Sequence, residues 1–551
     1  MLENTLMSLN HTISPPRKRK RSLEADALTD RGLSKRKTAE TVQLLSSPIQ
    51  LTKIRDLPAS CNLDTVNLKD ILGDPLIKEC WQFNFLFDVD FLMKHFDEDT
   101  RDLVQVRIVH GSWKREDGNK IRIDEACTRY KNIQAIQAYM PEPFGTHHSK
   151  MMILLRHDDC AQVVIHTANM ISQDWTNMTQ AVWRSPLLPL SSIDHPEPSS
   201  LIGSGARFKR DLLAYLRVYG QKRTGPLANQ LRKFDFSQVR AALVASTPSR
   251  QNLQSIDPTE ETLWGWPGLQ NILKHVPAKG KSEANPQIVA QISSIATLGQ
   301  TNKWLKDTFL STLSTTEGIT DGAKPELSII FPTADEIRRS LDGYISGGSI
   351  HTKIQSPPQK RQLDYLRPMM CHWAGDKEGR EVEKGTVREA GRRRAAPHIK
   401  TYIRFTDHSM SEIDWAMVTS ANLSTQAWGA AVNASREVRI CSWEIGVLVW
   451  PDLLKESQSN AVEMVPVFKT DMPSVLMPNE PSRPTGEHAA DLSRASKEVR
   501  QWDEKTPVSK IIGLRMPYDL PLVPYKQHEL PWCATAVHAE PDWMGQTWGN
   551  P

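Results

Sequence analysis

The sequence predicts an α/β fold of two similar domains, because a polar motif occurs twice and mixed strand and helix patterns surround each copy. The first copy has His-x-Lys at residues 148–150 and Thr-Ala-Asn at 167–169. The second copy, about 250 residues later, has His-x-Lys at 398–400 and Ser-Ala-Asn at 420–422. In both copies Gln follows the Asn by four residues and Trp follows it by six. We therefore expect two halves, each a mixed β-sheet flanked by helices, related by pseudo-twofold symmetry with one site at their interface.

The length agrees with two domains, since 551 residues are too many for one ordinary core. We place the junction near residue 239, which gives domains over residues 46–239 and 240–551. Helical spacing covers residues 208–234, and Thr333 followed by Glu336 predicts a capped helix start. Short apolar runs predict strands at residues 106–109, 133–136, 151–155, 163–165, 241–245, 288–292, 327–331, 402–405 and 415–418.

The paired motif has a physical reason in the period of a β-strand. Side chains two residues apart on an extended chain point to the same face, so His-x-Lys presents an imidazole beside an ammonium. Lys and Asn can hold phosphate oxygens, and His can act as nucleophile or as general acid and base. A single His-x-Lys is common by chance, and Trp175 and Trp428 are typical of core residues. Two matched copies, however, favour a site for an anion, above all a phosphodiester.

These motifs resemble the phospholipase D superfamily, whose signature is a pair of His-x-Lys motifs. The usual Asp five residues after each Lys is absent, because Leu155 and Phe405 occupy those places. This variant is similar to the tyrosyl-DNA phosphodiesterase family over roughly residues 50–551. In that family a Gln and a Glu replace the missing carboxylates, and here Gln180 and Glu444 stand at the matching places.

The resemblance implies a metal-independent mechanism without a cofactor, in which the two histidines have different roles. His148 would attack phosphorus and form a covalent phosphohistidine, and His398 would act as general acid and base. The neighbouring His147 lies three residues from Lys150, so the strand register selects His148. The other implied catalytic residues would stabilise the transition state or orient the imidazoles: Lys150, Lys400, Asn169, Asn422, Gln180 and Glu444.

The implied activity is a DNA repair hydrolase that releases a tyrosine or another adduct from a DNA 3′ end and leaves a 3′-phosphate. Substrates would be single-stranded or nicked double-stranded DNA, with a topoisomerase I-derived peptide as the adduct, and the enzyme would be a monomer. Phe144 is the candidate for base stacking and Trp548 for the peptide side. The candidates for phosphate hydrogen bonds in the DNA groove are Ser293, Ser294 and Thr297.

Composition narrows the protein class further. Seven scattered cysteines, with no Cys-x-x-Cys pair, argue against a disulfide scaffold and a structural zinc. No apolar run reaches the roughly 20 residues of a membrane span. Net charge is only +4, but basic clusters at residues 17–21 and 35–37 lie in a polar segment. We therefore expect residues 1–45 to be a disordered tail that directs the protein to the nucleus.

Two segments are expected to be flexible inserts, at about residues 376–394 and 473–496, because charge, Gly, Pro and Ser dominate them. The run of Arg at 392–394 is more typical of a solvated charged face than of a DNA contact. Two other functions stay open. A phospholipase would favour the Asp-bearing motif, and a catalytically inactive DNA-binding protein would have lost a His or Lys of the pairs.

Overall fold

The computed structural model describes residues 42–191, 201–279, 285–318, 324–373, 387–456, 461–474 and 508–549. Residues 1–41 of the expected basic tail (residues 1–45) and most of both expected inserts therefore lie outside the described residues. In the part described, strands and helices alternate along the chain, and the predicted α/β class is confirmed. None of the described helices is long and apolar enough to cross a membrane.

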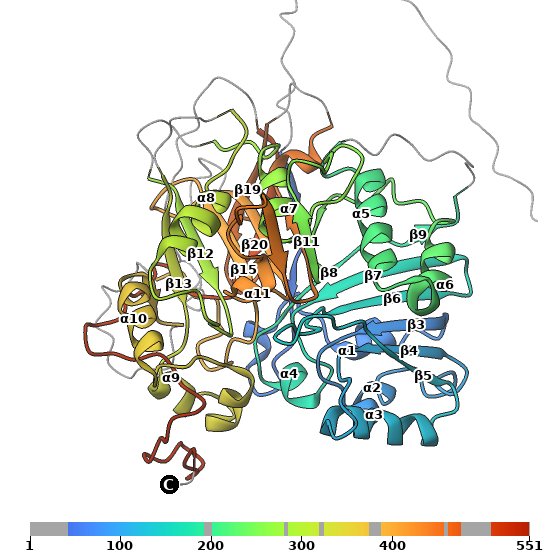
Figure 1. Cartoon of the computed structure of the whole chain (residues 1–551), viewed down its shortest axis with the longest axis horizontal. Helices are drawn as coiled ribbons and strands as arrows, with labels where there is room; N and C mark the ends of the chain where they lie inside the picture. Colours follow the sequence, from blue (N-terminus) through green and yellow to red (C-terminus); the bar gives the residue numbers. More distant parts are fainter. Residues whose placement is uncertain are drawn as a thin grey trace, which may run out of the picture. The chain divides into compact units, whose positions relative to one another are not determined.

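The first large sheet has the strand order β2-β8-β7-β6-β3-β4-β5, with the short β9 (Leu188–Pro189) added on β7. Its strands are β2 (Gln50–Leu51), β3 (Ile77–Phe83), β4 (Gln105–His110), β5 (Ile133–Gln137), β6 (Met151–Arg156), β7 (Cys160–His166) and β8 (Ala181–Arg184). The helices of this half are α1 (Leu68–Leu72), α2 (Val89–Met93), α3 (Gly118–Arg129), α4 (Ser172–Thr176), α5 (Gly205–Val218) and α6 (Gln221–Leu231). In Figure 1, α1, α2 and α3 lie on one side of this sheet and α5 and α6 on the other.

The second large sheet repeats this order as β10-β18-β16-β15-β12-β13-β14. Its strands are β10 (Ala242–Ser246), β12 (Gln287–Gln291), β13 (Glu326–Ile330), β14 (Met370–Cys371), β15 (Thr401–Phe405), β16 (Ile413–Thr419) and β18 (Glu444–Val449). The helices are α7 (Gly265–Leu273), α8 (Ser311–Leu313), α9 (Ala334–Arg338), α10 (Pro357–Leu366) and α11 (Thr425–Trp428).

The two sheets share their pairing directions as well as their order. In the first sheet β4 pairs in parallel with both β3 and β5, and in the second sheet β13 pairs in parallel with both β12 and β14. All other neighbours on the path are antiparallel. The duplication predicted from the motifs is therefore present in the topology, and the expected junction near residue 239 falls between α6 and β10.

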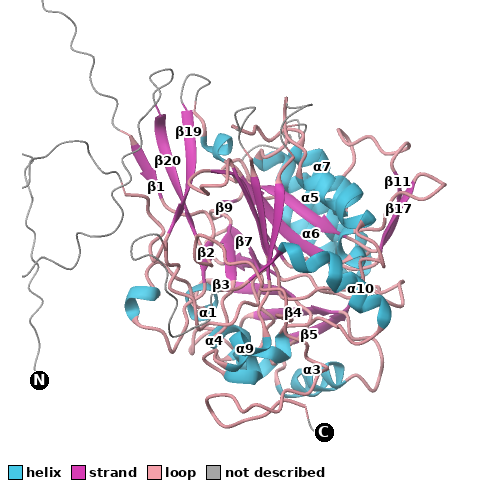
Figure 2. Ribbon diagram, turned by 90° about the vertical axis from the view of Figure 1, so that its left-hand side faces the viewer, coloured by secondary structure: helices cyan, strands magenta, loops and turns pink. Residues whose placement is uncertain are grey.

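Smaller elements complete the fold. Three strands form a parallel sheet, β1 (Gln43–Leu45), β20 (Val508–Arg515) and β19 (Ala461–Val467), and two form a ribbon, β11 (Ser249–Asn252) and β17 (Glu437–Ile440). The three-stranded sheet projects from the body in Figure 2. A π-helical segment at Trp304–Leu310 leads into α8, and 3-10 turns occur at Ala59–Cys61, Gly343–Ser349, Arg367–Met369 and Pro451–Leu454.

Strand alternation explains how the first sheet serves two cores. On β6, Met151 and Ile153 pack into the large central cluster, whereas Met152 and Leu154 pack into a second cluster with α2 and α3. The central cluster also contains residues of α5, β16 and β18, so it joins the two halves. The strands that carry the motifs are thus buried on both faces, which fixes the position of their ends.

Most sequence-based elements are confirmed, including the capping box of Thr333 and Glu336 at α9. Three residues of the expected tail, 43–45, instead form β1 and pair with β20. The expectation of a solvated Arg run is wrong for Arg392. Its side chain is buried and donates from Nη1 to the carbonyl of Thr52, while Arg393 donates to Asp519.

Candidate active site

The two His-x-Lys triplets occupy equivalent places, each directly before the strand that follows it. Residues 148–150 precede β6 and residues 398–400 precede β15, so the triplets form extended entries to the predicted strands rather than parts of them. In both triplets the Lys Nζ donates to the His carbonyl oxygen, at 3.1 Å for Lys150 and 2.5 Å for Lys400. The residue between them faces the interior, as Ser149 does when it meets the hydroxyl of Tyr215 at 2.5 Å.

Backbone pairing between the halves places each histidine beside a residue of the opposite half. The amide of His148 donates to the carbonyl of Trp443, at 3.0 Å, and the amide of His398 donates to that of Thr179, at 3.2 Å. Trp443 directly precedes Glu444, and Thr179 directly precedes Gln180. The same short parallel contact, made twice, therefore positions the predicted Glu and Gln at the imidazoles.

His148 forms a close contact with Glu444. Its Nδ1 lies 3.0 Å from Oε2 of Glu444, which also accepts a 2.5 Å hydrogen bond from the hydroxyl of Ser420. Burial lowers the pKa of His148, and the charge of Glu444 opposes that shift. Burial also works to raise the pKa of Glu444, but His148, Lys150 and Ser420 together lower it below its ordinary value, so this carboxyl stays ionised. Glu444 therefore holds a proton on Nδ1 and leaves Nε2 of His148 free.

His398 has two neighbours at its Nδ1. Nε2 of Gln180 lies at 3.1 Å, and Oδ2 of Asp174, on α4, lies at 3.0 Å. Burial lowers the pKa of His398 to about 3, and the charge of Asp174 opposes this. Nε2 of His398 faces Nζ of Lys400, at 3.1 Å. The sequence predicted Gln180 at this place and did not identify Asp174.

The lysines and histidines of the two halves lie close enough to influence one another electrostatically. Burial lowers the pKa of Lys150 to about 8, whereas Glu444 and Asp174 act to raise it. Burial lowers the pKa of Lys400 well below its ordinary value, and the charge of Lys150 lowers it further. An anion bound between these two amines would offset their repulsion, which is the property of a phosphate site.

The two asparagines are fixed by matching contacts. The indole Nε1 of Trp175 donates to the carbonyl of Asn169 and that of Trp428 to the carbonyl of Asn422, both at 3.0 Å. The predicted core tryptophans thus also hold the backbone of the Asn six residues before them. The side-chain oxygen of Asn422 accepts from the amides of residues 293 and 294, at 3.0 and 2.9 Å, which orients its amide nitrogen.

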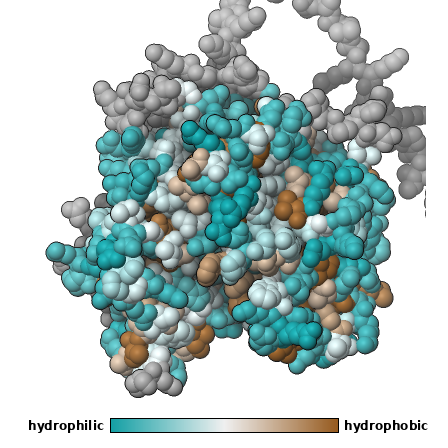
Figure 3. Space-filling view, in the orientation of Figure 1, coloured by the Kyte–Doolittle hydropathy of each residue, from teal (hydrophilic) through white to brown (hydrophobic). Residues whose placement is uncertain are grey.

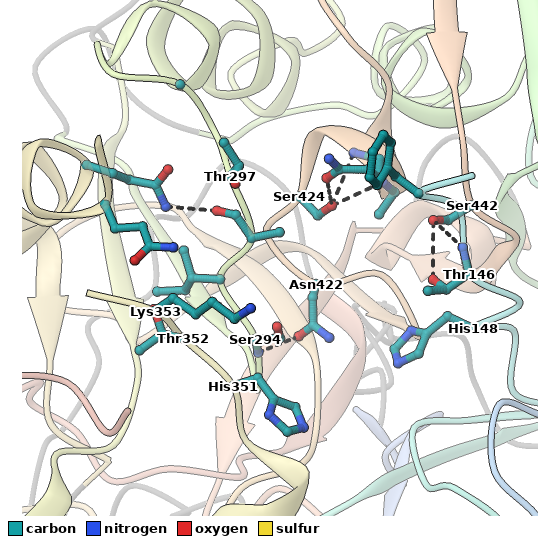
Figure 4. A pocket seen from close by; sticks show the side chains of 18 of the residues that line it. Thr146, His148, Ser294, Thr297, His351, Thr352, Lys353, Asn422, Ser424 and Ser442 are labelled. Atoms are coloured by element: carbon teal, nitrogen blue, oxygen red, sulfur yellow. Dashed lines mark hydrogen bonds between the residues drawn. The ribbon is translucent and has the colours of Figure 1, made fainter. Parts of the chain in front are cut away.

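A cavity of about 900 Å³ opens at this site. In Figure 4, Asn422 lies between Ser294, to which it is hydrogen-bonded, and His148. Of the predicted site residues, those that line the cavity are Phe144, His148, Ser294, Thr297, Asn422 and Glu444. Phe144 is 79% exposed, as a residue that stacks on a ligand needs to be.

The other predicted site residues do not line this cavity: Lys150, Asn169, Gln180, Ser293, His398, Lys400 and Trp548. His147, which the strand register set aside, is also absent from the lining. His147 faces the interior, because its Nδ1 meets the carbonyl of Asn84 and its Nε2 meets the hydroxyl of Tyr219. Ser293 is buried and donates to Asn422, so its place is behind that amide rather than in the groove. Trp548 lies outside this cavity and packs edge-on against Trp532.

Several lining residues were not identified from the sequence. Phe85 packs edge-on against the ring of His148, with centroids 5.6 Å apart. His351 and Lys353 follow the 3-10 turn and line the same wall as Ser294. Their neighbourhood depends on a parallel contact between residues 294 and 351, which no local pattern indicates. Within the described ranges, no group of three His, Cys, Asp or Glu residues forms a metal-binding arrangement.

Comparison with known proteins assigns the chain to a family. A family model described as tyrosyl-DNA phosphodiesterase matches residues 48–526. The chain belongs to the tyrosyl-DNA phosphodiesterase family. It is accordingly a phosphodiesterase, and the resemblance inferred from the paired motifs is confirmed.

Individual members of the tyrosyl-DNA phosphodiesterase family support the assignment over nearly the whole chain. A probable tyrosyl-DNA phosphodiesterase of Schizosaccharomyces pombe is 31% identical over 569 aligned residues, covering 92% of this chain and 96% of that protein. Tyrosyl-DNA phosphodiesterase 1 of Arabidopsis thaliana is 29% identical and covers 92% and 77%. The crystal structure of the yeast tyrosyl-DNA phosphodiesterase has a TM-score of 0.58 at 21% identity, covering 88% and 98%. The fold is thus the two-domain phospholipase D-like fold.

Proposed function

We propose that this phosphodiesterase repairs DNA by cleaving the bond between the DNA 3′ end and a tyrosine or another adduct. The reaction passes through a covalent phosphohistidine and leaves a 3′-phosphate. The observation that carries the proposal is the pair of imidazoles, each with a carboxylate oxygen 3.0 Å from its Nδ1 and a lysine two residues further along the chain. Of the two imidazoles, His148 lines the cavity of about 900 Å³. The names of the relatives point to the same class of substrate.

In the first step, Nε2 of His148 attacks phosphorus and the bond from phosphorus to the tyrosine oxygen breaks. Glu444 holds the proton on Nδ1 and offsets the positive charge that develops on the attacking imidazole. The tyrosine oxygen takes a proton from Nε2 of His398 as it departs. Lys150 and Lys400 stabilise the charge of the crowded phosphorus centre, together with the two asparagines.

In the second step, Nε2 of His398 removes a proton from a water molecule, which attacks phosphorus. The bond from phosphorus to Nε2 of His148 breaks, so His148 returns to its starting form and the DNA keeps a 3′-phosphate. The same imidazole therefore acts as acid and then as base, as the reversal of the step requires. In this scheme the side chains supply the charge that stabilises phosphate, and no step needs a divalent cation.

The DNA strand enters along the cavity, where an exposed Phe144 offers a face for base stacking and Phe85 lies beside His148. Ser294 and Thr297 offer hydrogen bonds to phosphate, and Lys353 adds a positive charge on the same wall. A peptide derived from topoisomerase I would occupy the opposite side of the histidine pair. We propose further that the enzyme works as a monomer and that its basic tail directs it to the nucleus.

The test is incubation with an oligonucleotide that carries a 3′-phosphotyrosine, in the presence of EDTA. The expected product is a 3′-phosphate end. His148→Ala should abolish turnover and give no covalent adduct, because the nucleophile is missing. His398→Asn should accumulate DNA joined to the protein, because the second step loses its base while a phenolate can still leave. A covalent band from the His148 variant instead would mean that the two roles are reversed.

The alternatives make different predictions in the same assay. A phospholipase would leave the oligonucleotide intact and hydrolyse lipid headgroups, for which an apolar docking surface would be needed. The face in Figure 3 is mostly hydrophilic, with apolar side chains in small groups. An inactive DNA-binding protein would bind the oligonucleotide without product, although both His-x-Lys pairs are present.

A further inference from the structure

We infer that Asp174 is the positioning residue of His398, which it holds with the proton on Nδ1 and supports in its protonated form. The inference rests on the proposed function, because it assigns the carboxylate partner of the general acid and base. Asp174 lies on α4 and is completely buried. Its Oδ2 lies 3.0 Å from Nδ1 of His398.

Only one of the two side chains near Nδ1 of His398, Asp174 or Gln180, can accept a hydrogen bond from that nitrogen. A carboxylate can only accept, so the contact with Asp174 requires a proton on Nδ1. An amide nitrogen can only donate, so Nε2 of Gln180 cannot be the partner of that same proton. The two contacts at Nδ1 are therefore mutually exclusive as hydrogen bonds, although both distances are short.

The surroundings of Gln180 fix which contact is real. Its Oε1 accepts a 2.7 Å hydrogen bond from the hydroxyl of Thr167, and its Nε2 lies 3.3 Å from the main-chain carbonyl of Asp174. Turning the amide over would place two oxygens against each other at that carbonyl. Gln180 therefore presents its nitrogen toward the imidazole, and Asp174 is the acceptor for Nδ1.

The duplication gives a second line of evidence. Glu444 and Gln180 occupy equivalent places in the two halves. The residue after Glu444 accepts a backbone hydrogen bond from Ser420, and the residue after Gln180 accepts one from Thr167. The half that carries Gln180 lacks a charge at this position. Asp174, five residues after Asn169, supplies a carboxylate there, whereas the place five residues after the second Asn holds Ala427. Each imidazole thus receives one carboxylate, but from different sequence positions.

Asp174 is held in place independently of His398. Its Oδ2 accepts from the amide of Asn169, at 2.6 Å, and its Oδ1 accepts from the hydroxyl of Ser349, at 3.2 Å. Burial works to raise the pKa of Asp174, but His398, the amide of Asn169 and Lys400 together bring that pKa below its ordinary value. A fixed, ionised carboxylate can stabilise the imidazolium that burial otherwise disfavours.

The decisive variant is Asp174→Asn, which keeps the shape and removes the charge. Two oligonucleotides are compared, one with a 3′-phosphotyrosine and one with a 3′-p-nitrophenyl phosphate, whose leaving group needs less protonation. The variant should lose at least tenfold in kcat on the tyrosyl substrate and release the first equivalent of p-nitrophenol almost as fast as wild type. DNA joined to the protein should accumulate on denaturing gels, because the second step needs the base.

Two control variants show whether Asp174 positions His398 or only stabilises the fold around it. Ser349→Ala removes a partner of Asp174 but leaves its contact with His398, so it should lower kcat only a few-fold and trap no adduct. Gln180→Ala should affect kcat less than Asp174→Asn does. The inference would be overturned if Asp174→Asn lost the same factor in kcat on both substrates and formed no covalent adduct. It would also be overturned if the Gln180 variant, and not the Asp174 variant, accumulated the adduct.

Two further measurements distinguish a failure of the Asp174 inference from misfolding of the variant and from a failure of the proposed function. If Asp174→Asn does not fold, Asp174→Glu replaces it, and a changed pH profile of kcat is expected while an unchanged profile refutes the inference. If wild-type protein does not cleave the tyrosyl substrate at all, the proposed function fails before Asp174 is tested. If the wild type is active but the folded Asp174 variant accumulates no covalent adduct, the role of Asp174 is refuted and the proposed function is not.

Discussion

Replacing Glu444 by Gln removes one charge from the hydrogen bond that orients the proposed nucleophile. Gln keeps the length of the side chain and an oxygen that can accept from Nδ1 of His148 and from Ser420. What disappears is the negative charge 3.0 Å from the imidazole. The side chain of Glu444 is only 5% exposed, so water cannot take over its place.

The expected loss follows from the strength of a charge-assisted hydrogen bond. Such bonds contribute about 1.5–3 kcal/mol, and each ~1.4 kcal/mol corresponds to a tenfold change in rate. The charge matters most when His148 attacks, since the imidazole then becomes positive. Glu444→Gln should therefore slow the first step by roughly 10- to 150-fold. It should not trap a covalent adduct, because the general base at His398 is intact.

The assay is single-turnover cleavage of the 3′-phosphotyrosyl oligonucleotide, with a denaturing gel for the adduct. Ser420→Ala is the control, because it removes the other donor to Glu444 and leaves the carboxylate beside His148. It should lose less activity than Glu444→Gln. A Glu444→Gln enzyme within twofold of wild type, with unchanged urea stability, would refute the reasoning that this charge supports the nucleophile.

The remaining predictions concern metal, the tail and pH. Turnover should be unchanged in EDTA, since lysine and asparagine donors already cover the phosphate charge; loss that Mg²⁺ restores would contradict the mechanism. Deleting residues 1–41, which spares β1, should leave cleavage of a short oligonucleotide unchanged and reduce nuclear accumulation seen by microscopy, whereas a misfolded product would show that the tail is not separable. His372 lies between Glu336 and Glu529, and although its burial works to lower its pKa, the two carboxylates raise it overall. The contribution of His372 to folding stability is complete below the unfolded pKa of about 6.5 and is lost as the pH rises through the higher folded pKa. His372→Gln should therefore lower the thermal unfolding temperature more at about pH 5.5 than at about pH 9.

Because the motif is duplicated, the sequence by itself predicted the family, the two-domain fold and the candidate site residues of this protein. Two His-x-Lys triplets with matching Asn and Trp identified the two halves, and short apolar runs located the strands that carry them. The strand period also separated His148 from His147, whose ring turns into the core. These are local properties, since each depends on residues within a few positions of one another.

Only the tertiary structure decided which side chains meet across the halves. The short backbone pairings at His148 and His398 bring residues together that are separated by about 220 to 300 positions. Asp174 could be read in the sequence as another polar residue of a helix turn, and Arg392 as one of a charged run. Their burial depends on which elements pack over them, and a sequence pattern carries no distance between elements. Local periodicity therefore predicts strands and motifs, while long-range packing selects the partners of each charge.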